Sequence, residues 1–361
     1  ALFFHDAPGD VHLMNEKLLT IVVPCWNSED YMCRCLDSLV EGGDQVEVII
    51  VDDGSTDRTG EIADHYAQIY HNIVKVIHKE NGGHGSGVNA GLAAATGTYF
   101  KVVDSDDWLD DEAFAHLLGS IGKFTDMKKK DSYATIPDLF VCNYIYDHLD
   151  EGVTQQMAYR NVFPAGQLCG WNTIGHFHPS QYLVMHALVF RTDILRRADI
   201  HLPEHTFYVD NLFSYQPLPL VEHIYYMDVD LYHYYLGRED QSVNEKVLMK
   251  RIDQQIYVTR LVSQCANLDE VAEKHPKLAV YMRRNISIMM AISSIHLLLI
   301  NTPEAYQKRK QLWQDIRKRN AALYYQLKYR TLSGLTYLPG KVGGKLTIGG
   351  YRLANRIYKF Q

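Results

Sequence analysis

Short apolar runs recur at regular spacing through the first part of the chain, and each is followed by turn residues and a helical pattern. Val and Ile are frequent in these runs, as expected of strands that are covered on both faces. Strands that alternate with helices at this spacing imply right-handed crossovers between parallel strands. The pattern therefore predicts an α/β fold with a doubly wound sheet. The runs occupy residues 18–24, 46–51, 74–78 and 98–103.

The regular alternation of strands and helices ends after the fourth run. We expect a helix over about 111–121, a polar loop or lid over 123–132, and one more strand of the sheet over 138–147. Residues 152–235 are irregular and rich in aromatic residues and His, whereas helical periodicity dominates residues 246–329. A helical region is therefore expected to follow the sheet.

The sequence shows no pattern of export or of a membrane crossing. Residues 1–13 lack a charged segment followed by an apolar one, and we expect them to be an added segment before a natural start at Met14. The apolar stretch 286–300 contains several Ser and a His, is too short to cross a bilayer, and is predicted to be a buried helix. Six cysteines without CxxC spacing indicate neither a zinc site nor a disulfide framework, which favours a reducing cytosolic compartment.

Charge is distributed unevenly along the chain. The hydrophobic content of 47% and charged content of 22% are ordinary for a globular protein, and the net charge of −7 gives no reason to expect a nucleic-acid-binding protein. Residues 303–361 nevertheless contain thirteen Lys or Arg against only Glu304 and Asp315. This end of the chain is therefore strongly basic.

The last part of the basic stretch is amphipathic. Interleaved cations and apolar residues suit an anionic membrane surface, and they equally suit a helix face packed on the rest of the chain. Both interpretations stay open, while RNA binding lacks an accompanying aromatic-rich module. The cations are Lys341, Lys345, Arg352, Arg356 and Lys359, and the apolar residues are Leu338, Val342, Leu346, Ile348, Leu353, Ile357 and Phe360.

The acidic segment Asp104-Ser105-Asp106-Asp107 comes directly after the fourth apolar run. Ligands bind at the carboxyl ends of strands in open α/β sheets, and the repulsion between neighbouring carboxylates is relieved by a hard divalent cation. The segment therefore predicts a metal site. The alternative is a solvated acidic turn that caps the next helix.

A second acidic segment, Asp52 to Asp57, follows the second run. Asp53 is predicted to accept hydrogen bonds from a nucleotide base or ribose, because it ends a strand next to the first acidic segment. Asp57 is predicted to cap the following helix instead.

A glycine-rich segment, residues 81–91, follows the third run, and part of it matches the dinucleotide fingerprint GxGxxA. This match makes a dinucleotide-binding oxidoreductase a competing interpretation. Three residues separate the turn from its strand, however, and the turn follows the third strand and not the first. A single ribose-binding acid would also not call for Asp104, Asp106 and Asp107 together.

Four segments resemble the family 2 glycosyltransferases of GT-A fold: IVVPCWNSEDYMCRCLDSL, VIIVDDGSTDRTGEIADHY, NGGHGSGVNAGLAAATGTYFKVVDSDDWL and YVDNLFSYQPL. The resemblance covers residues 18 to about 235, with the four motifs in order at suitable spacing. It implies a Rossmann-like domain with a mixed sheet, and inverting transfer of a sugar from a nucleotide-diphosphate donor, usually UDP-linked, with Mn²⁺ or Mg²⁺ on the diphosphate.

The resemblance also implies roles for individual residues. Asp53 is expected to face the base, and Asp104 and Asp106 to form the DxD that contacts ribose and metal, with Asp107 as a further metal candidate. Asp210 is expected to be the general base that takes a proton from the acceptor hydroxyl. The other expected nucleotide-sugar contacts are Pro24, Asn27, Lys79, Gly83, His84, Asn89, Ser105 and Arg238.

Two positions depart from the family pattern. Many relatives have Arg where this chain has Val88, so a diphosphate contact is expected from Lys79 or His84. The family's Glu-Asp pair is Val209-Asp210 here, which keeps only the second acid. The alternative role of Asp210 is to cap the segment that follows it.

Further histidines and aromatic residues have no assigned role in this pattern. The histidines lack HxxxH spacing and are interpreted as satisfied polar residues or acceptor contacts. The aromatic residues either stack on sugar rings or belong to the core. The histidines are His176, His178, His186, His205 and His233, and the aromatic residues are Trp108, Trp171, Tyr182 and Tyr208.

The predicted organisation is a GT-A domain over residues 14–240, divided into a nucleotide-sugar half (14–125) and an acceptor half (126–240). A helical region (241–330) and a basic tail (331–361) follow. The resemblance implies a metal-dependent transferase acting on a glycan or lipid-linked acceptor, as in cell-surface polysaccharide biosynthesis, in the cytoplasm or peripherally on the membrane. A non-catalytic protein of the same fold is the alternative.

Overall fold

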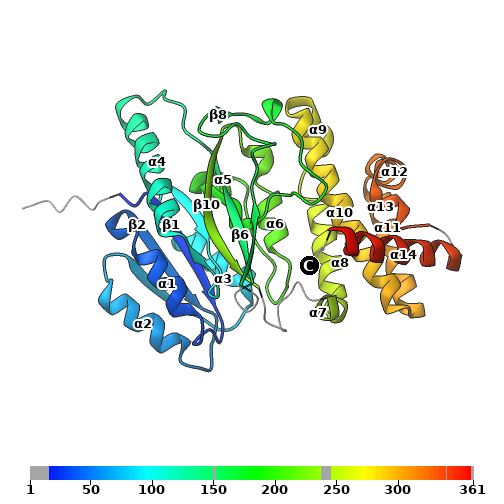
Figure 1. The fold of residues 1–361 in the computed structure, drawn as a ribbon, viewed down its shortest axis with the longest axis horizontal. Helices are drawn as coiled ribbons and strands as arrows, with labels where there is room; N and C mark the ends of the chain where they lie inside the picture. The colour runs from blue at the N-terminus through cyan, green and yellow to red at the C-terminus, as the bar shows by residue number, and fades with distance from the viewer. Residues whose placement is uncertain (1–15, 149–151, 237–244, 339, 359–361) are drawn as a thin grey trace, which may run out of the picture.

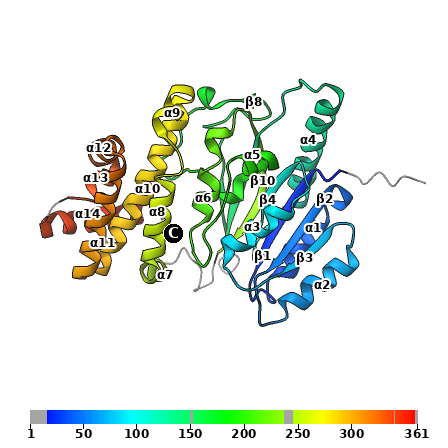
Figure 2. The same cartoon turned by 180° about the vertical axis from the view of Figure 1, so that it is seen from behind.

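A sheet with helices around it forms the larger part of the molecule, and the later helices gather at one end (Figure 1). The structure is a computed structural model that describes residues 16–148, 152–236, 245–338 and 340–358. Figure 2 shows from behind that the helices α8 to α14 lie together, away from the strands of the N-terminal half. None of the described helices combines the length and the apolar character that a membrane crossing requires.

The sheet has ten strands in the order β3-β2-β1-β4-β9-β6-β10-β5, with β7 beside β6 and β8 beside β10. The first four strands pair in parallel, as the strand and helix alternation predicts. Strand β9 pairs antiparallel with both β4 and β6, so the sheet is mixed. The strands are β1 (Leu19–Cys25), β2 (Val46–Asp52), β3 (Val74–His78), β4 (Tyr99–Val102), β5 (Trp108–Leu109), β6 (Leu139–His148), β7 (Val153–Met157), β8 (Leu168–Cys169), β9 (Leu188–Arg191) and β10 (Ile224–Tyr235).

Helices of the sheet domain differ from the expected ones at two places. The third helix begins at His84, earlier than expected, and the predicted polar loop or lid at 123–132 is mostly the end of the fourth helix. Phe124 is buried there against Phe140 and Tyr225, which extends the helix through a polar sequence. The helices are α1 (Met32–Val40), α2 (Thr59–Ile69), α3 (His84–Ala94), α4 (Asp111–Lys130), α5 (Thr192–Arg197) and α6 (Asp210–Tyr215).

The helical region packs around α10, whose second half is buried as the sequence predicts. The N-terminal half of α10 also contacts the sheet domain, because Arg284 donates to the carbonyl oxygens of His178 and Gln181 at 2.6 and 2.8 Å. The helices are α7 (Glu245–Lys250), α8 (Ile252–Val262), α9 (Leu268–Lys274), α10 (Pro276–Ile300), α11 (Pro303–Arg319), α12 (Ala321–Arg330), α13 (Leu332–Leu335) and α14 (Gly340–Tyr358).

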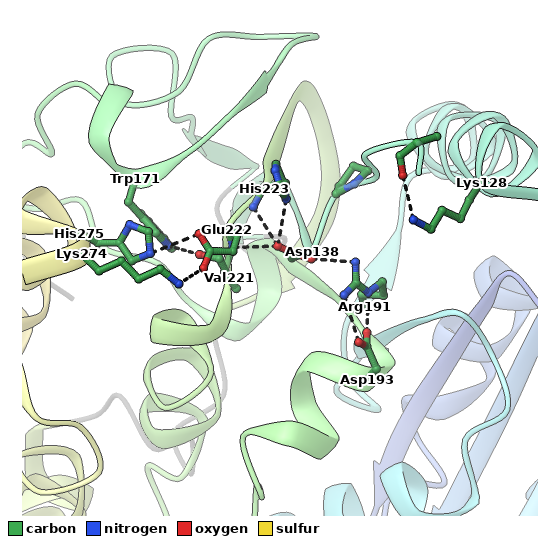
Figure 3. A network of polar contacts seen from close by, with 12 residues as sticks. Lys128, Asp138, Trp171, Arg191, Asp193, Val221, Glu222, His223, Lys274 and His275 are labelled. Carbon is green, nitrogen blue, oxygen red and sulfur yellow. Dashed lines mark hydrogen bonds and ion pairs between the residues drawn. The ribbon is translucent and has the colours of Figure 1, made fainter. Parts of the chain in front are cut away.

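A polar network joins the sheet to the helical region (Figure 3). The buried carboxylate of Asp138, before β6, accepts from the backbone N–H groups of Glu222 and His223 at 2.7 and 2.9 Å and pairs with Arg191 of β9 at 2.8 Å. The side chain of Glu222 in turn pairs with Lys274 at the end of α9 (Figure 3). The network therefore connects β6 and β9 to α9 through the turn that contains Glu222 and His223.

Helix α3 approaches β1 closely, and glycine makes this approach possible. A Cβ atom at Gly91 would lie 2.3 Å from Cγ1 of Val22, which is closer than any ordinary contact. On the exposed side of α4, by contrast, a Cβ atom at Gly119 would meet no atom within 4 Å.

These two glycines give opposite predictions. Gly91→Ala should lower the free energy of unfolding by about 1–3 kcal/mol, because the methyl group overpacks the core. Gly119→Ala should raise it by up to about 1 kcal/mol, because alanine has the better helix propensity. Thermal and denaturant unfolding of both variants measures the two changes, and equal effects would contradict the packing of α3 on β1.

Candidate active site

Asp104 lies directly beyond the carboxyl end of β4, among polar side chains from several elements. Its Oδ1 lies 2.8 Å from Nε2 of His84, the first residue of α3. Its Oδ2 lies 3.6 Å from Nε2 of His186, which belongs to a short turn that leads into β9. Two imidazole rings from distant parts of the sequence therefore face the two oxygens of one carboxylate.

The charges of this cluster support one another. Burial alone would raise the pKa of Asp104, but His84 and His186 hold it well below its usual range. Burial alone would likewise lower the pKa of His84, yet the neighbouring Asp104 raises it overall. Asp104 is therefore an ionised carboxylate at neutral pH, as a cation ligand must be.

Asp107 is fully buried and fastens the acidic turn to β10. Its Oδ2 accepts a hydrogen bond from the Tyr232 hydroxyl at 2.5 Å, and its Oδ1 accepts from the backbone N–H of Tyr235 at 2.8 Å. Burial, with the charges of Asp106 and Asp104, raises the pKa of Asp107. Because both oxygens have partners, Asp107 anchors the turn whether or not it also contacts a metal.

Among the described residues, one cluster has the spacing of a metal site, and it differs from the predicted acidic set. Asp104, Asp107 and His186 each offer one ligand atom, and these atoms lie within 4.8 Å of one another. Asp106 is half-buried and is not a member of the cluster. The hydroxyl groups of Ser105 and Ser28 are hydrogen-bonded at 2.8 Å.

From its sequence context His186 is interpreted as a satisfied polar residue or an acceptor contact, and the sequence does not place it beside Asp104. Its Nε2 is buried without a hydrogen-bond partner, and its ring centroid lies 4.7 Å from those of both Tyr232 and Tyr234. A buried ring nitrogen without a partner needs a functional or structural reason. HxxxH spacing detects two histidines on one helix, whereas His186 reaches Asp104 through strand pairing, so the local sequence carries no signal of this contact.

Asp53 lies at the end of β2, and the glycine-rich turn surrounds its carboxylate. The oxygens accept from Lys79 Nζ at 2.8 Å and from the backbone N–H groups of Gly82 and Gly83 at 2.9 and 2.6 Å. Gly83 has a φ of 84°, a conformation that favours glycine. Asp53, Lys79 and Gly83 therefore form one unit between β2 and α3.

Pro24 and Asn27 lie at the end of β1, beside this unit. A Cβ atom at Gly87 of α3 would lie 3.0 Å from Cβ of Pro24, so the helix passes directly over the proline. Oδ1 of Asn27 accepts from the backbone N–H of Thr56 at 2.8 Å, which joins the turns after β1 and β2. Both residues thus lie where three elements of the predicted nucleotide half meet.

Asn89 lines a pocket together with Leu202 and Pro203, and its side-chain amide is hydrogen-bonded to the backbone there. Its Nδ2 donates to the carbonyl oxygen of Leu202 at 2.8 Å, and its Oδ1 accepts from the backbone N–H of Leu202 at 2.9 Å. A Cβ atom at Gly85 would lie 2.8 Å from the carbonyl oxygen of Pro203. Gly85 therefore admits the segment that leads to α6, while Gly87 and Gly91 admit β1, and these contacts explain the glycine spacing without a dinucleotide.

Asp210 is the first residue of α6, and the N-cap position is occupied by Val209, which makes no side-chain capping bond. The half-buried carboxyl group of Asp210 accepts from Nδ2 of Asn211 at 3.4 Å. Burial raises the pKa of Asp210, partly offset by the charges of His186 and His84. The charge of Asp104 acts on Asp210 in the opposite direction to these two histidines.

The aromatic candidates separate into two groups. Trp171 is buried and donates from Nε1 to the carbonyl oxygen of Val221 at 2.8 Å, so it belongs to the core. Trp108 stacks on His233 at 5.0 Å between ring centroids, and the Arg34 guanidinium lies 3.3 Å from its ring centroid.

Tyr182 and Tyr208 form the second group. Burial raises the pKa of both hydroxyl groups, and the negative charge of Asp210 contributes to the increase. Of the other predicted residues, His176, His178 and His205 are exposed, His233 pairs with Asp147 at 3.1 Å, and Arg238 lies outside the described residues.

Comparison with known proteins agrees with this architecture. Residues 20–143 match the model of glycosyl transferase family 2. EpsH of Bacillus subtilis is 27% identical over 300 residues, which are 79% of this chain and 78% of that protein. EpsJ of the same organism is 29% identical over 222 residues, which are 60% of each chain. Both are named as glycosyltransferases.

The solved structure of Staphylococcus aureus TarS, residues 1–349, superimposes with a TM-score of 0.66 at 20% identity and covers 93% of this chain and 92% of that one. The fold similarity thus includes the helical region, beyond the family match. The mixed sheet, the acidic turn after β4 and the sequence relatives agree with one another: this chain is a transferase of the glycosyltransferase type, with a GT-A-like fold and a family 2 match over residues 20–143.

Proposed function

We propose that this protein transfers a sugar, with inversion, from a UDP-linked donor to a hydroxyl group of a glycan or lipid-linked acceptor, with the help of Mn²⁺ or Mg²⁺. The observation that carries the proposal is the grouping of Asp104 with His84 and His186 beyond the end of β4. TarS, whose fold is similar, is known in complex with UDP-GlcNAc, which makes UDP the first nucleotide to test.

The nucleotide is proposed to lie over the ends of β1, β2 and β4. Asp53 directly follows β2 and would hydrogen-bond the base, while Pro24 and Asn27 bound the same region. The Asp53 carboxylate now accepts three hydrogen bonds from the glycine turn, so base binding would exchange or share one of these donors. Lys79 and His84 are the proposed cations for the diphosphate.

Asp104 and His186 are the proposed first contacts of the divalent cation, with Asp106 and Asp107 as the other candidates. The orphaned Nε2 of His186 beside an ionised carboxylate fits a cation with mixed nitrogen and oxygen ligands. A bound cation would supply positive charge that stabilises the departing diphosphate. Asp107 keeps the turn fixed to β10, so the ligands are already positioned.

Asp210 is proposed to be the general base. The acceptor oxygen attacks the anomeric carbon from the face opposite the nucleotide, and its proton passes to the Asp210 carboxylate. The bond between the anomeric carbon and the diphosphate oxygen breaks, and its electron pair leaves with the diphosphate. The raised pKa of Asp210 brings this carboxyl group closer to the working pH, which favours proton transfer. Tyr182 and Tyr208 are the aromatic candidates for contacts with the acceptor.

Replacing the base should separate binding from transfer. Asp210→Asn keeps the size of the side chain but deletes the proton acceptor, so we expect donor binding near wild type and a loss of transfer of about 10²-fold or more. Calorimetry with UDP and a nucleotide-release assay with a panel of UDP-sugars and acceptors measure the two quantities. Asp126→Asn, on the exposed side of α4, is the matched control and should keep full activity. Normal turnover of Asp210→Asn would assign the residue to a structural role.

The metal assignment has its own test. UDP should bind more tightly with Mn²⁺ than with EDTA, and His186→Gln should weaken Mn²⁺ binding by about 10-fold or more, measured by electron paramagnetic resonance without substrate turnover. Asp106→Ala is predicted to remove the metal-dependent gain in UDP affinity. His176→Gln, an exposed histidine, serves as the control. Equal UDP affinity in Mn²⁺ and EDTA would exclude the metal site, and a normal Mn²⁺ signal in His186→Gln would exclude His186 alone.

A further inference from the structure

The C-terminal helices leave a row of aliphatic side chains uncovered. Leu332 and Leu335 of α13 and Val342, Leu346 and Leu353 of α14 are each between 59% and 73% exposed. Helices α13 and α14 lie with α12 in the helical region, which is separated from α1 and α2 by the sheet (Figures 1 and 2). Monomeric proteins seldom expose contiguous aliphatic surface without a use for it. We call these five residues the aliphatic face.

Helix α14 is fixed to the protein by its opposite side. Gly343, Gly344, Thr347 and Tyr351 share one side of the helix, because residues about four positions apart lie above one another. Gly344 comes close to Leu298 of α10, and the Tyr351 hydroxyl donates to Glu245 at 2.9 Å. The spacing of Val342, Leu346 and Leu353 places them on the other side. One side of α14 is therefore packed against the protein, and the other side is exposed.

The segment that carries the aliphatic face contains basic residues and no acidic ones. No Asp or Glu follows Asp315, although the chain as a whole has a net charge of −7. Lys345 and Arg352 are exposed and, by helical spacing, flank the aliphatic face of α14. The neighbouring α12 adds the exposed Tyr325 and Tyr329, whose rings stack at 6.0 Å, and aromatic residues of this kind favour the membrane interface.

We propose that the aliphatic face docks on an anionic lipid bilayer, with its apolar side chains among the acyl chains and Lys345 and Arg352 at the head groups. Charge complementarity favours a bilayer over a second copy of this chain as the partner of the aliphatic face. A second copy of this chain would bring the same acid-free surface against itself, since a symmetric dimer pairs identical patches. An anionic bilayer instead supplies the missing negative charge and takes up the apolar row.

This inference deepens the proposed function, since its use to the enzyme depends on an acceptor that is lipid-linked or held at a membrane. Docking through α13 and α14 would leave the sheet domain, at the other end of the molecule, free to bind donor. Vesicle binding and donor hydrolysis are separate measurements, so the two proposals can fail independently.

Co-sedimentation with vesicles tests the docking surface. The full chain should sediment with vesicles that contain phosphatidylglycerol and much less with pure phosphatidylcholine, and high salt should weaken the binding. The triple variant Val342→Ser, Leu346→Ser and Leu353→Ser should bind at least about 10-fold less, because it loses the apolar contacts that drive insertion. Its matched control replaces three equally exposed aliphatic residues elsewhere, Ile69→Ser, Val153→Ser and Val280→Ser, and should bind as wild type does.

Charge reversal provides a second pair of variants. Lys345→Glu with Arg352→Glu should abolish the preference for anionic vesicles, whereas Lys123→Glu with Lys130→Glu, on the exposed side of α4, should not. Thermal melts and donor hydrolysis should be unchanged in all four variants, which confirms that they fold. The proposal is overturned if the full chain ignores phosphatidylglycerol vesicles at low salt, or if it binds both lipids equally. It is also overturned if sedimentation velocity shows that the aliphatic face joins two copies of the chain.

Discussion

The antiparallel pairing of β9 with β4 is the contact on which the site depends. Tyr99 and Phe100 of β4 lie opposite Arg191 and Phe190 of β9, so the segment before β9 must run past the end of β4. That end is where Asp104 begins the acidic turn. Pairing in this register therefore brings His186 to Asp104 across more than eighty residues of sequence, and it inserts an antiparallel strand into an otherwise parallel half-sheet.

The strands and the acidic turns were predictable, because each follows from a local pattern. The first four strands match the expected runs to within about one residue, since buried parallel strands are continuous apolar segments. The extended α4 was missed because its final turns are mostly polar, and only Phe124 and Thr125 are buried there. The position of His186 beside Asp104 was not predicted for a different reason: it depends on which strands are neighbours, and the sequence alone does not state strand order.

The predicted nucleotide residues form a connected structure that needs no ligand to hold its shape. Asp53 orders the glycine turn, and that turn gives α3 the start that places His84 beside Asp104. Asn89, farther along α3, fixes Leu202 and so the segment before Asp210. Donor and acceptor sides are thus linked through one helix. A substitution that shifts α3 is expected to displace both His84 and the segment before Asp210. Loss of a single contact would affect only one of them.

A buried lysine explains how the fold tolerates several carboxylates at one strand end. Lys101 of β4 is fully buried, its Nζ donates to the carbonyl oxygen of His186 at 2.7 Å, and it lies 5.0 Å from the ring centroid of Tyr232. Burial lowers the pKa of Lys101 to about 8, while the charges of Asp104 and Asp107 act in the opposite direction. Lys101 therefore lies beneath the acidic turn, where its charge and those of Asp104 and Asp107 offset part of the cost of burying one another.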